Sequence, residues 1–145
     1  MAHRQLAQVR GQTAVTCYAI DPSQSDQPFV SALTETPGDL VLHLPEPAVG
    51  AQLEGELARQ WAATLALVAS QFIRHHRPPT LLLVGGDTSV HLLKLLGIET
   101  LQVQAELLPG MPLTVGQTAT GERYQIILKA GNHGDEQTLV ALFSL

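Results

Sequence analysis

The stretch Leu82–Ile98, LLVGGDTSVHLLKLLGI, decides the fold that this sequence predicts. It begins inside an aliphatic run, Thr80–Val84, which has the composition of a buried strand. Two glycines interrupt that run, and apolar residues then recur at helical spacing over Thr88–Leu96 until Gly97 ends the pattern. We therefore expect a strand, a tight glycine loop and a helix, which is the repeating unit of an α/β domain.

The rest of the chain predicts the other layers of such a domain. The longest apolar stripe predicts a helix over Gly50–His75, which Arg77–Pro79 ends. Further strands are expected over Thr13–Ile20, Asp39–Pro45, Thr100–Ala105, Leu113–Gln117 and Tyr124–Lys129, with short helices over His3–Val9, Phe29–Leu33 and Asp135–Phe143. The fold class is therefore α/β, with α/β/α layers around a largely parallel sheet and a C-terminal β-hairpin that turns near Thr120 and Gly121.

Composition narrows the class of protein. The chain has 145 residues, which predicts a single domain over 1–145, and its formal net charge is −5. Nucleic acid is not an expected partner, because the densest basic patch is only Arg74–Arg77. No apolar stretch is long enough to span a membrane and the start does not look like a signal peptide, so we expect a cytoplasmic protein. The single cysteine, Cys17, is expected to be a buried core thiol.

A second glycine loop, Gly131–Gly134, follows another predicted strand and precedes another predicted helix. Free N–H groups at the start of a helix favour an anion, and α/β sheets bind ligands at the carboxyl ends of their strands. Neither loop matches the P-loop or the GxGxxG dinucleotide motif. Each loop alone also fits an ordinary turn, with Asp87 as a helix cap in the first. The pair indicates a phosphate or nucleotide site, with plain turns as the alternative.

Other side chains give weaker signals. No HxxxH or CxxC spacing is present, so no metal site is expected, and no GxSxG motif surrounds Ser89 to support a nucleophile. His91 and His133 belong to the two loops and can converge as nucleotide contacts. Lys129, at the end of a strand, can either reach a phosphate or face solvent.

Two segments together resemble a known family. They read LLLVGGDTSVHLLKLLGIETLQVQAELLPGMPL (Leu81–Leu113) and ILKAGNHGDEQTL (Ile127–Leu139). This chain resembles the C-terminal nucleotide-binding domain of the four-carbon acid sugar kinases, which has a GG[DE]T loop, a helix ending in LGI, an E..PG.P segment and a K-S-G-[GN]-F-G-[DA]-E loop. The resemblance is specific over Thr80–Leu142 and extends more loosely back to Arg4.

The resemblance implies ATP binding, with accompanying Mg²⁺, between the two glycine loops. The residues that match the family's two loops are Gly85, Gly86, Asp87, Thr88, Gly131, Asn132 and Gly134. The sugar-acid site and the catalytic base belong to a separate domain in the family, so we expect no catalytic residue in this chain. It would then be a fragment or a split subunit of a kinase that phosphorylates a sugar acid such as threonate, erythronate or 3-oxo-tetronate, with the sugar-acid-binding domain on another chain.

Several positions depart from the family pattern. His133 stands where the family prefers Phe, Ala130 stands where it prefers Ser, and bulkier residues, Val90 and His91, follow the first loop. A serine-containing segment that precedes the first helix in the family has no counterpart here. These departures favour the alternative function, a non-catalytic nucleotide-sensing or dimerisation module. A domain of this kind that lacks its neighbour exposes apolar surface, so we also expect a homodimer or another homo-oligomer.

Overall fold

The computed structural model describes residues 2–12, 14–23, 38–45 and 55–145. The first elements are α1 (Ala2–Arg10), β1 (Val15–Ala19), β2 (Asp39–His43), α3 (Gly55–His76) and β3 (Thr80–Val84). The later elements are α4 (Gly86–Leu96), β4 (Leu101–Leu108), β5 (Met111–Gln117), β6 (Arg123–Lys129) and α5 (Thr138–Phe143). The predicted helix over Phe29–Leu33 and the first residues of the predicted long helix lie outside the described residues.

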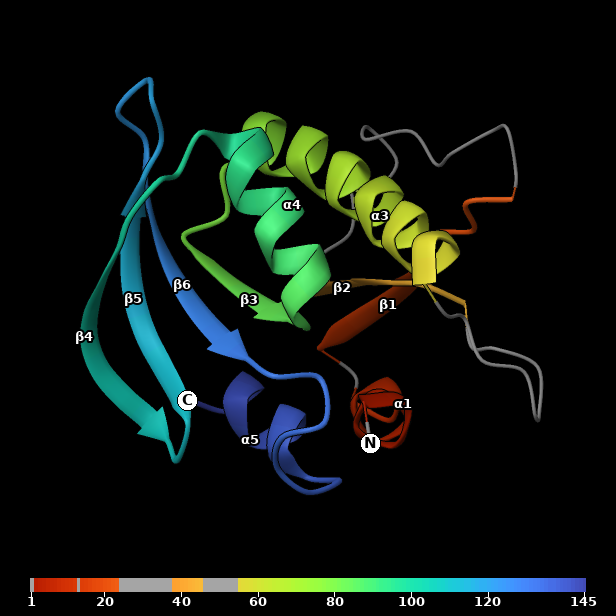
Figure 1. Ribbon diagram of the computed structural model, residues 1–145. Coiled ribbons are helices and arrows are strands. Elements are labelled where there is room, and N and C mark those ends of the chain that lie inside the picture. The colour runs from red at the N-terminus through yellow and green to blue at the C-terminus, as the bar shows by residue number, and fades with distance from the viewer. Residues whose placement is uncertain (1, 13, 24–37, 46–54) are drawn as a thin grey trace.

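The strands form two sheets (Figure 1). β1 pairs with β2 in parallel, and the larger sheet has the order β3-β6-β5-β4. β3 and β6 are parallel, whereas β6, β5 and β4 are joined by antiparallel pairing. The predicted α/β class and the C-terminal hairpin are confirmed. The pairing of β4 with β5 was not predicted; it follows from a turn at Pro109 and Gly110, where Gly110 has a φ of 75°.

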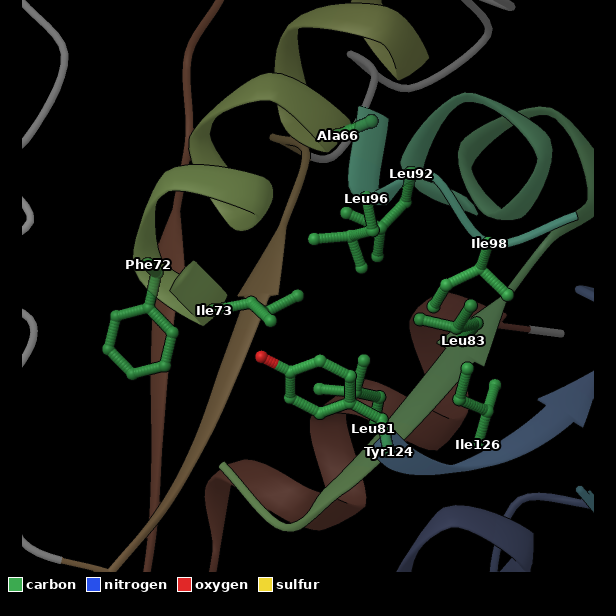
Figure 2. Packing of buried hydrophobic residues seen from close by; sticks show 10 residues of the cluster. All are labelled: Ala66, Phe72, Ile73, Leu81, Leu83, Leu92, Leu96, Ile98, Tyr124 and Ile126. Atoms are coloured by element: carbon green, nitrogen blue, oxygen red, sulfur yellow. The ribbon is translucent and has the colours of Figure 1, made fainter. Parts of the chain in front are cut away.

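Helices cover both faces of the strands, which gives the predicted α/β/α layers. Alternate residues of β3 point to opposite faces: Leu81 and Leu83 pack with α3 and α4, whereas Leu82 and Val84 pack with α1 and α5. In Figure 1, α3 and α4 accordingly lie on one side of the strands and α1 and α5 on the other. Figure 2 shows the first of these cores: Ala66, Phe72, Ile73, Leu81, Leu83, Leu92, Leu96, Ile98, Tyr124 and Ile126.

The ends of α4 are set by glycines. Gly97 adopts the left-handed conformation, and the N–H groups of Gly97 and Ile98 donate to carbonyls of the last turn, which confirms the predicted end of the helix. The helix begins at Gly86, two residues earlier than the predicted Thr88. Helix α5 begins at Thr138 instead of Asp135, because residues 135–137 form a turn whose hydrogen bonds involve the Asp135 carboxylate and the Thr138 hydroxyl.

Two further expectations from the sequence concern the burial of Cys17 and the presence of a membrane-spanning helix. Cys17 is only half-buried and packs at the edge of the α1/α5 core, so it is not the fully buried thiol that was expected. Of the helices that the structure describes, none combines the length and the apolar character that crossing a membrane requires.

The α3/α4 core is the place where a single truncation has the largest effect on stability. Ile126 is 0 % exposed, so the change Ile126→Ala should lower the free energy of unfolding by about 3 kcal/mol, through lost burial and the cavity that remains. Chemical denaturation measures this loss. The control is Val103→Ala on β4, where the side chain is 66 % exposed and little change is expected. Equal losses in the two variants would contradict this assignment of the core.

Candidate functional site

The two glycine loops lie side by side because β3 and β6 are parallel neighbours. Val84 and Lys129, the last residues of these strands, are partners in the register, and the Gly85 N–H donates to the Lys129 carbonyl at 3.0 Å. A Cβ built on Gly131 would lie 3.9 Å from the Cα of Gly85. Gly85 and Gly131 are 46 positions apart in the sequence, yet their loops meet at one edge of the sheet.

The first loop presents unpaired backbone amides. Gly85 occupies the cap position of α4 with a φ of 89°, and its carbonyl accepts the first helical bond from the Ser89 N–H at 3.2 Å. The amides of Gly86, Asp87 and Thr88 come before that bond, and none of them has an acceptor among the described residues. Together with the positive end of the helix dipole, these amides can bind an anion.

Two side-chain details complete the first loop. The alternative in which Asp87 caps the helix is wrong, because no side chain makes a capping hydrogen bond and the Asp87 carboxylate is left exposed. Ser89 turns back and donates from its Oγ to the Gly85 carbonyl at 2.6 Å, so its hydroxyl supports the loop. A Cβ on Gly85 or Gly86 would meet no atom within 4 Å, so another group can approach the backbone of this loop at these two glycines.

In the second loop, two side chains donate hydrogen bonds to the backbone carbonyls. Lys129 Nζ donates to the Ala130 carbonyl at 2.8 Å and lies 3.4 Å from that of Gly131. Gln5 Nε2, on α1, donates to the carbonyls of His133 at 3.0 Å and Asp135 at 2.7 Å. The carbonyls of Ala130, Gly131, His133 and Asp135 are thus directed toward side chains of the protein and paired there.

The amides of the second loop are directed the other way. In a trans peptide the C=O and the next N–H point in opposite directions, and the described residues contain no cis peptide. Holding the carbonyls of Ala130, Gly131 and His133 inward therefore turns outward the N–H groups that follow them. These are the amides of Gly131, Asn132 and Gly134, for which the described part of the chain offers no acceptor. Successive outward amides form a concave site for an anion.

Lys129 places its ammonium group next to the second loop. Its side chain is 3 % exposed, and it makes no salt bridge with a carboxylate of the described residues. Burial lowers the pKa of its ammonium because the charged form loses its hydration. The predicted alternative of a solvent-facing Lys129 is wrong, because the ammonium bonds to loop carbonyls inside the protein.

The loop histidines are not brought together by any described contact. The Nε2 of His133 lies 2.6 Å from the Pro109 carbonyl, so its ring reaches toward the turn between β4 and β5. A Cβ on Gly110 would lie 2.8 Å from that nitrogen, which explains why the turn has a glycine there. His91 is a half-buried residue of α4, and the structure gives it no bond to His133. The convergence of His91 and His133 as nucleotide contacts stays a prediction.

Sequence reasoning missed one residue of the site, Gln5. The pattern of α1 offered a weak signal, since Gln5 is a polar residue beside Leu6 on the face that turns inward, and it is 0 % exposed. No motif connects this residue to a loop that lies 128 positions later.

The burial of Lys129 predicts a pH dependence of stability. Its pKa is lowered from the ordinary 10.5 in the folded state, so between the folded and the unfolded pKa the unfolded chain binds more protons. The contribution of Lys129 to the free energy of unfolding must then increase as the pH rises toward 10.5. We expect the free energy of unfolding of the wild type, minus that of Lys129→Met, to increase from pH 7 to pH ~10 in chemical denaturation. A flat or falling difference would show that burial does not disfavour the charged ammonium.

Known proteins of one family are similar to this chain. A family model described as a nucleotide-binding C-terminal domain matches residues 1–139. The chain is 32% identical over 130 residues to the 3-oxo-tetronate kinase of Burkholderia multivorans, a match that covers 89% of this chain and 28% of that protein. It is also 35% identical over 82 residues to the 3-oxo-isoapionate kinase of Paraburkholderia graminis, which covers 55% of this chain and 17% of that protein.

A solved structure shows the same fold. A domain of unknown function from Bordetella bronchiseptica, crystallised with bound citrate as a domain-swapped dimer, superposes with a TM-score of 0.77. It is 22% identical in sequence, and the match covers 98% of this chain and 37% of that chain. The present chain spans about 28% of the length of the 3-oxo-tetronate kinase that it matches. The match over residues 1–139 confirms the resemblance seen in the sequence: this chain belongs to the family of nucleotide-binding C-terminal domains found in the four-carbon acid sugar kinases.

Proposed function

We propose that this chain binds ATP, with accompanying Mg²⁺, between its two glycine loops and serves as the nucleotide-binding domain, over 1–145, of a kinase for a four-carbon sugar acid. One observation carries the proposal. Two neighbouring loops have amides without an acceptor among the described residues, and the side chains that hold the second loop pair its carbonyls instead. The proposed binding residues are Gly85, Gly86, Asp87, Thr88, Gly131, Asn132 and Gly134.

These residues suit the triphosphate of a nucleotide. Phosphoryl transfer depends mainly on positioning and on neutralising the charge of the phosphate oxygens. The amides of the two loops and the start of α4 supply oriented positive dipoles, and the Lys129 ammonium adds a charge behind the second loop. Mg²⁺ would neutralise further phosphate charge when bound, and the exposed Asp87 carboxylate suits a metal-bound water at the mouth of the first loop.

The acceptor substrate requires residues beyond this chain. We assign no catalytic residue here, and we place the sugar-acid site and the base that activates its hydroxyl on another domain or chain. The relatives named as kinases are more than three times as long as the segment they share with this chain, which supports an acceptor site outside this segment. The acceptor would be a sugar acid such as threonate, erythronate or 3-oxo-tetronate, phosphorylated in the cytoplasm.

Self-association is a further part of this proposal. Exposed aliphatic side chains occur on three elements: Leu57 and Leu67 on α3, Val90 on α4 and Val103 on β4. We propose that some of these residues contact a second copy of the chain or a sugar-acid-binding domain. Size-exclusion chromatography with light scattering tests this point, and a monomer at all concentrations would argue against self-association.

A second candidate function is a non-catalytic nucleotide sensor. The observation that favours it is the position of His133, which bonds to the Pro109 carbonyl and so ties the second loop to the β4–β5 turn. A kinase assay with the acceptor domain of a relative, added as a separate polypeptide, discriminates between the two functions. Turnover in the mixture supports the split kinase, whereas nucleotide binding without turnover supports the sensor.

Isothermal titration calorimetry tests the nucleotide site directly. The variant Gly85→Ala places a Cβ at a φ of 89° where no neighbouring atom interferes, so its effect is backbone strain of about 1–2 kcal/mol. We expect the wild type to bind Mg-ATP and Gly85→Ala to bind at least tenfold more weakly, because relief of that strain moves the amides of the first loop.

Gly121→Ala is the matched control for this experiment. Gly121 also has a positive φ, 96°, and a Cβ there would meet only the amide of Gln117 at 3.8 Å. Gly121 lies in the β5–β6 turn, just before β6 begins. The second loop of the proposed site begins where β6 ends, so the control position lies at the opposite end of this strand. The control should lose similar stability and keep its nucleotide affinity. No heat of binding for the wild type at millimolar Mg-ATP would refute the proposed function.

A further inference from the structure

Gln5 joins helix α1 to the second glycine loop. Its side chain is 0 % exposed, and both hydrogens of its amide group are used, one for the His133 carbonyl at 3.0 Å and one for the Asp135 carbonyl at 2.7 Å. These carbonyls flank Gly134, one of the proposed nucleotide-binding residues. We propose that Gln5 is a positioning residue that fixes the direction of the Gly134 N–H toward the phosphates, an inference that rests on the proposed function.

The peptide between His133 and Gly134 is the unit that Gln5 controls. Because its C=O and N–H point in opposite directions, a bond that holds the His133 oxygen toward α1 directs the Gly134 N–H away from α1. The second bond of Gln5 acts in the same way on the peptide between Asp135 and Glu136. It holds the Asp135 carbonyl and so orients the Glu136 N–H. Gln5 therefore sets two amides without contacting the ligand.

This peptide needs an external restraint. Gly134 has a φ of 86°, and glycine accepts both signs of φ, so rotation of the peptide beside it costs little. Local hydrogen bonds between Asp135 and Thr138 fix the turn that follows, at 2.9 and 3.2 Å, but they do not involve the His133 carbonyl. Gln5 is the side chain that holds this carbonyl among the described residues.

The chemistry of the Gln5 site fits positioning better than stability. Its Oε1 is buried with no donor among the described residues, and an unpaired buried oxygen is unfavourable. Methionine has a similar length and no such oxygen, so Gln5→Met loses two hydrogen bonds but also removes this penalty. The nearby ion pair between Arg4 and Glu136, at 3.4 Å, is mostly exposed and adds little to the docking of α1. The effect on ligand binding should then exceed the effect on folding.

Calorimetry with Mg-ATP on the full chain compares Gln5→Met with Gln8→Met, the same change at an exposed position of α1. We expect affinity to fall at least tenfold for Gln5→Met and to stay unchanged for Gln8→Met, with both melting temperatures close to that of the wild type. A folded Gln5→Met with wild-type affinity overturns this inference only, whereas a wild type that does not bind Mg-ATP overturns the proposed function and this inference with it.

Gln5→Glu provides a readout that a purely structural role would not give. An ionised carboxyl facing two carbonyl oxygens has no proton to donate and is repelled by them, whereas a protonated carboxyl donates one bond. The ratio of the variant's dissociation constant to that of the wild type should therefore fall as the pH is lowered from 8 to 5. The groups Arg4, Lys129, His133, Asp135 and Glu136 occur in both proteins, so their titration largely cancels in the ratio. A ratio that does not change with pH refutes the donor role of Gln5, and this test remains if Gln5→Met does not fold.

Discussion

The parallel pairing of β3 with β6 is the constraint on which the rest of this structure depends. It places Val84 beside Lys129, so the glycine loops that follow the two strands begin at the same edge of the sheet. The pairing continues past the strands through the bond from the Gly85 N–H to the Lys129 carbonyl. Both strands are buried between helices, with Ile126 facing α3 and α4 and Ile127 facing α1 and α5. The hydrophobic cores thus fix the spacing of the loops, whereas the direction of their peptides depends on side chains that bond to the loop carbonyls.

An acidic chain that binds a nucleotide has to attract phosphate without many cations. This protein carries a net charge of −5, and one ammonium, that of Lys129, bonds to its second glycine loop. The arrangement relies instead on backbone amides, which carry partial charge in fixed directions and lose no side-chain freedom on binding. Such amides are effective only if the carbonyls of the same loop are turned away. Lys129 and Gln5 meet this requirement by holding carbonyls on the protein side.

The sequence predicted the parts of the fold that depend on local pattern. The aliphatic run of β3, the glycines after it and the left-handed Gly97 determine a strand, a loop and a helix with little help from other segments. Features that depend on distant contacts were missed or misplaced. The role of Gln5 follows from the packing of α1 against α5, and the direction of His133 follows from the turn at Pro109. The start of α4 at Gly86 moved Asp87 into the first turn and left the cap to a glycine.

The same distinction separates the proposed binding residues from the residues that orient them. Glycines of the loops can be recognised in a sequence because they occur together and next to strands, but a glycine loop has no preferred direction of its own. Direction comes from donors on other elements: Ser89 within α4, Lys129 at the end of β6 and Gln5 on α1. These three side chains bond to carbonyls of the loops and do not occupy the amides of the proposed binding residues. A substitution that preserves every loop glycine can therefore still disrupt the proposed nucleotide site, if it removes one of these donors.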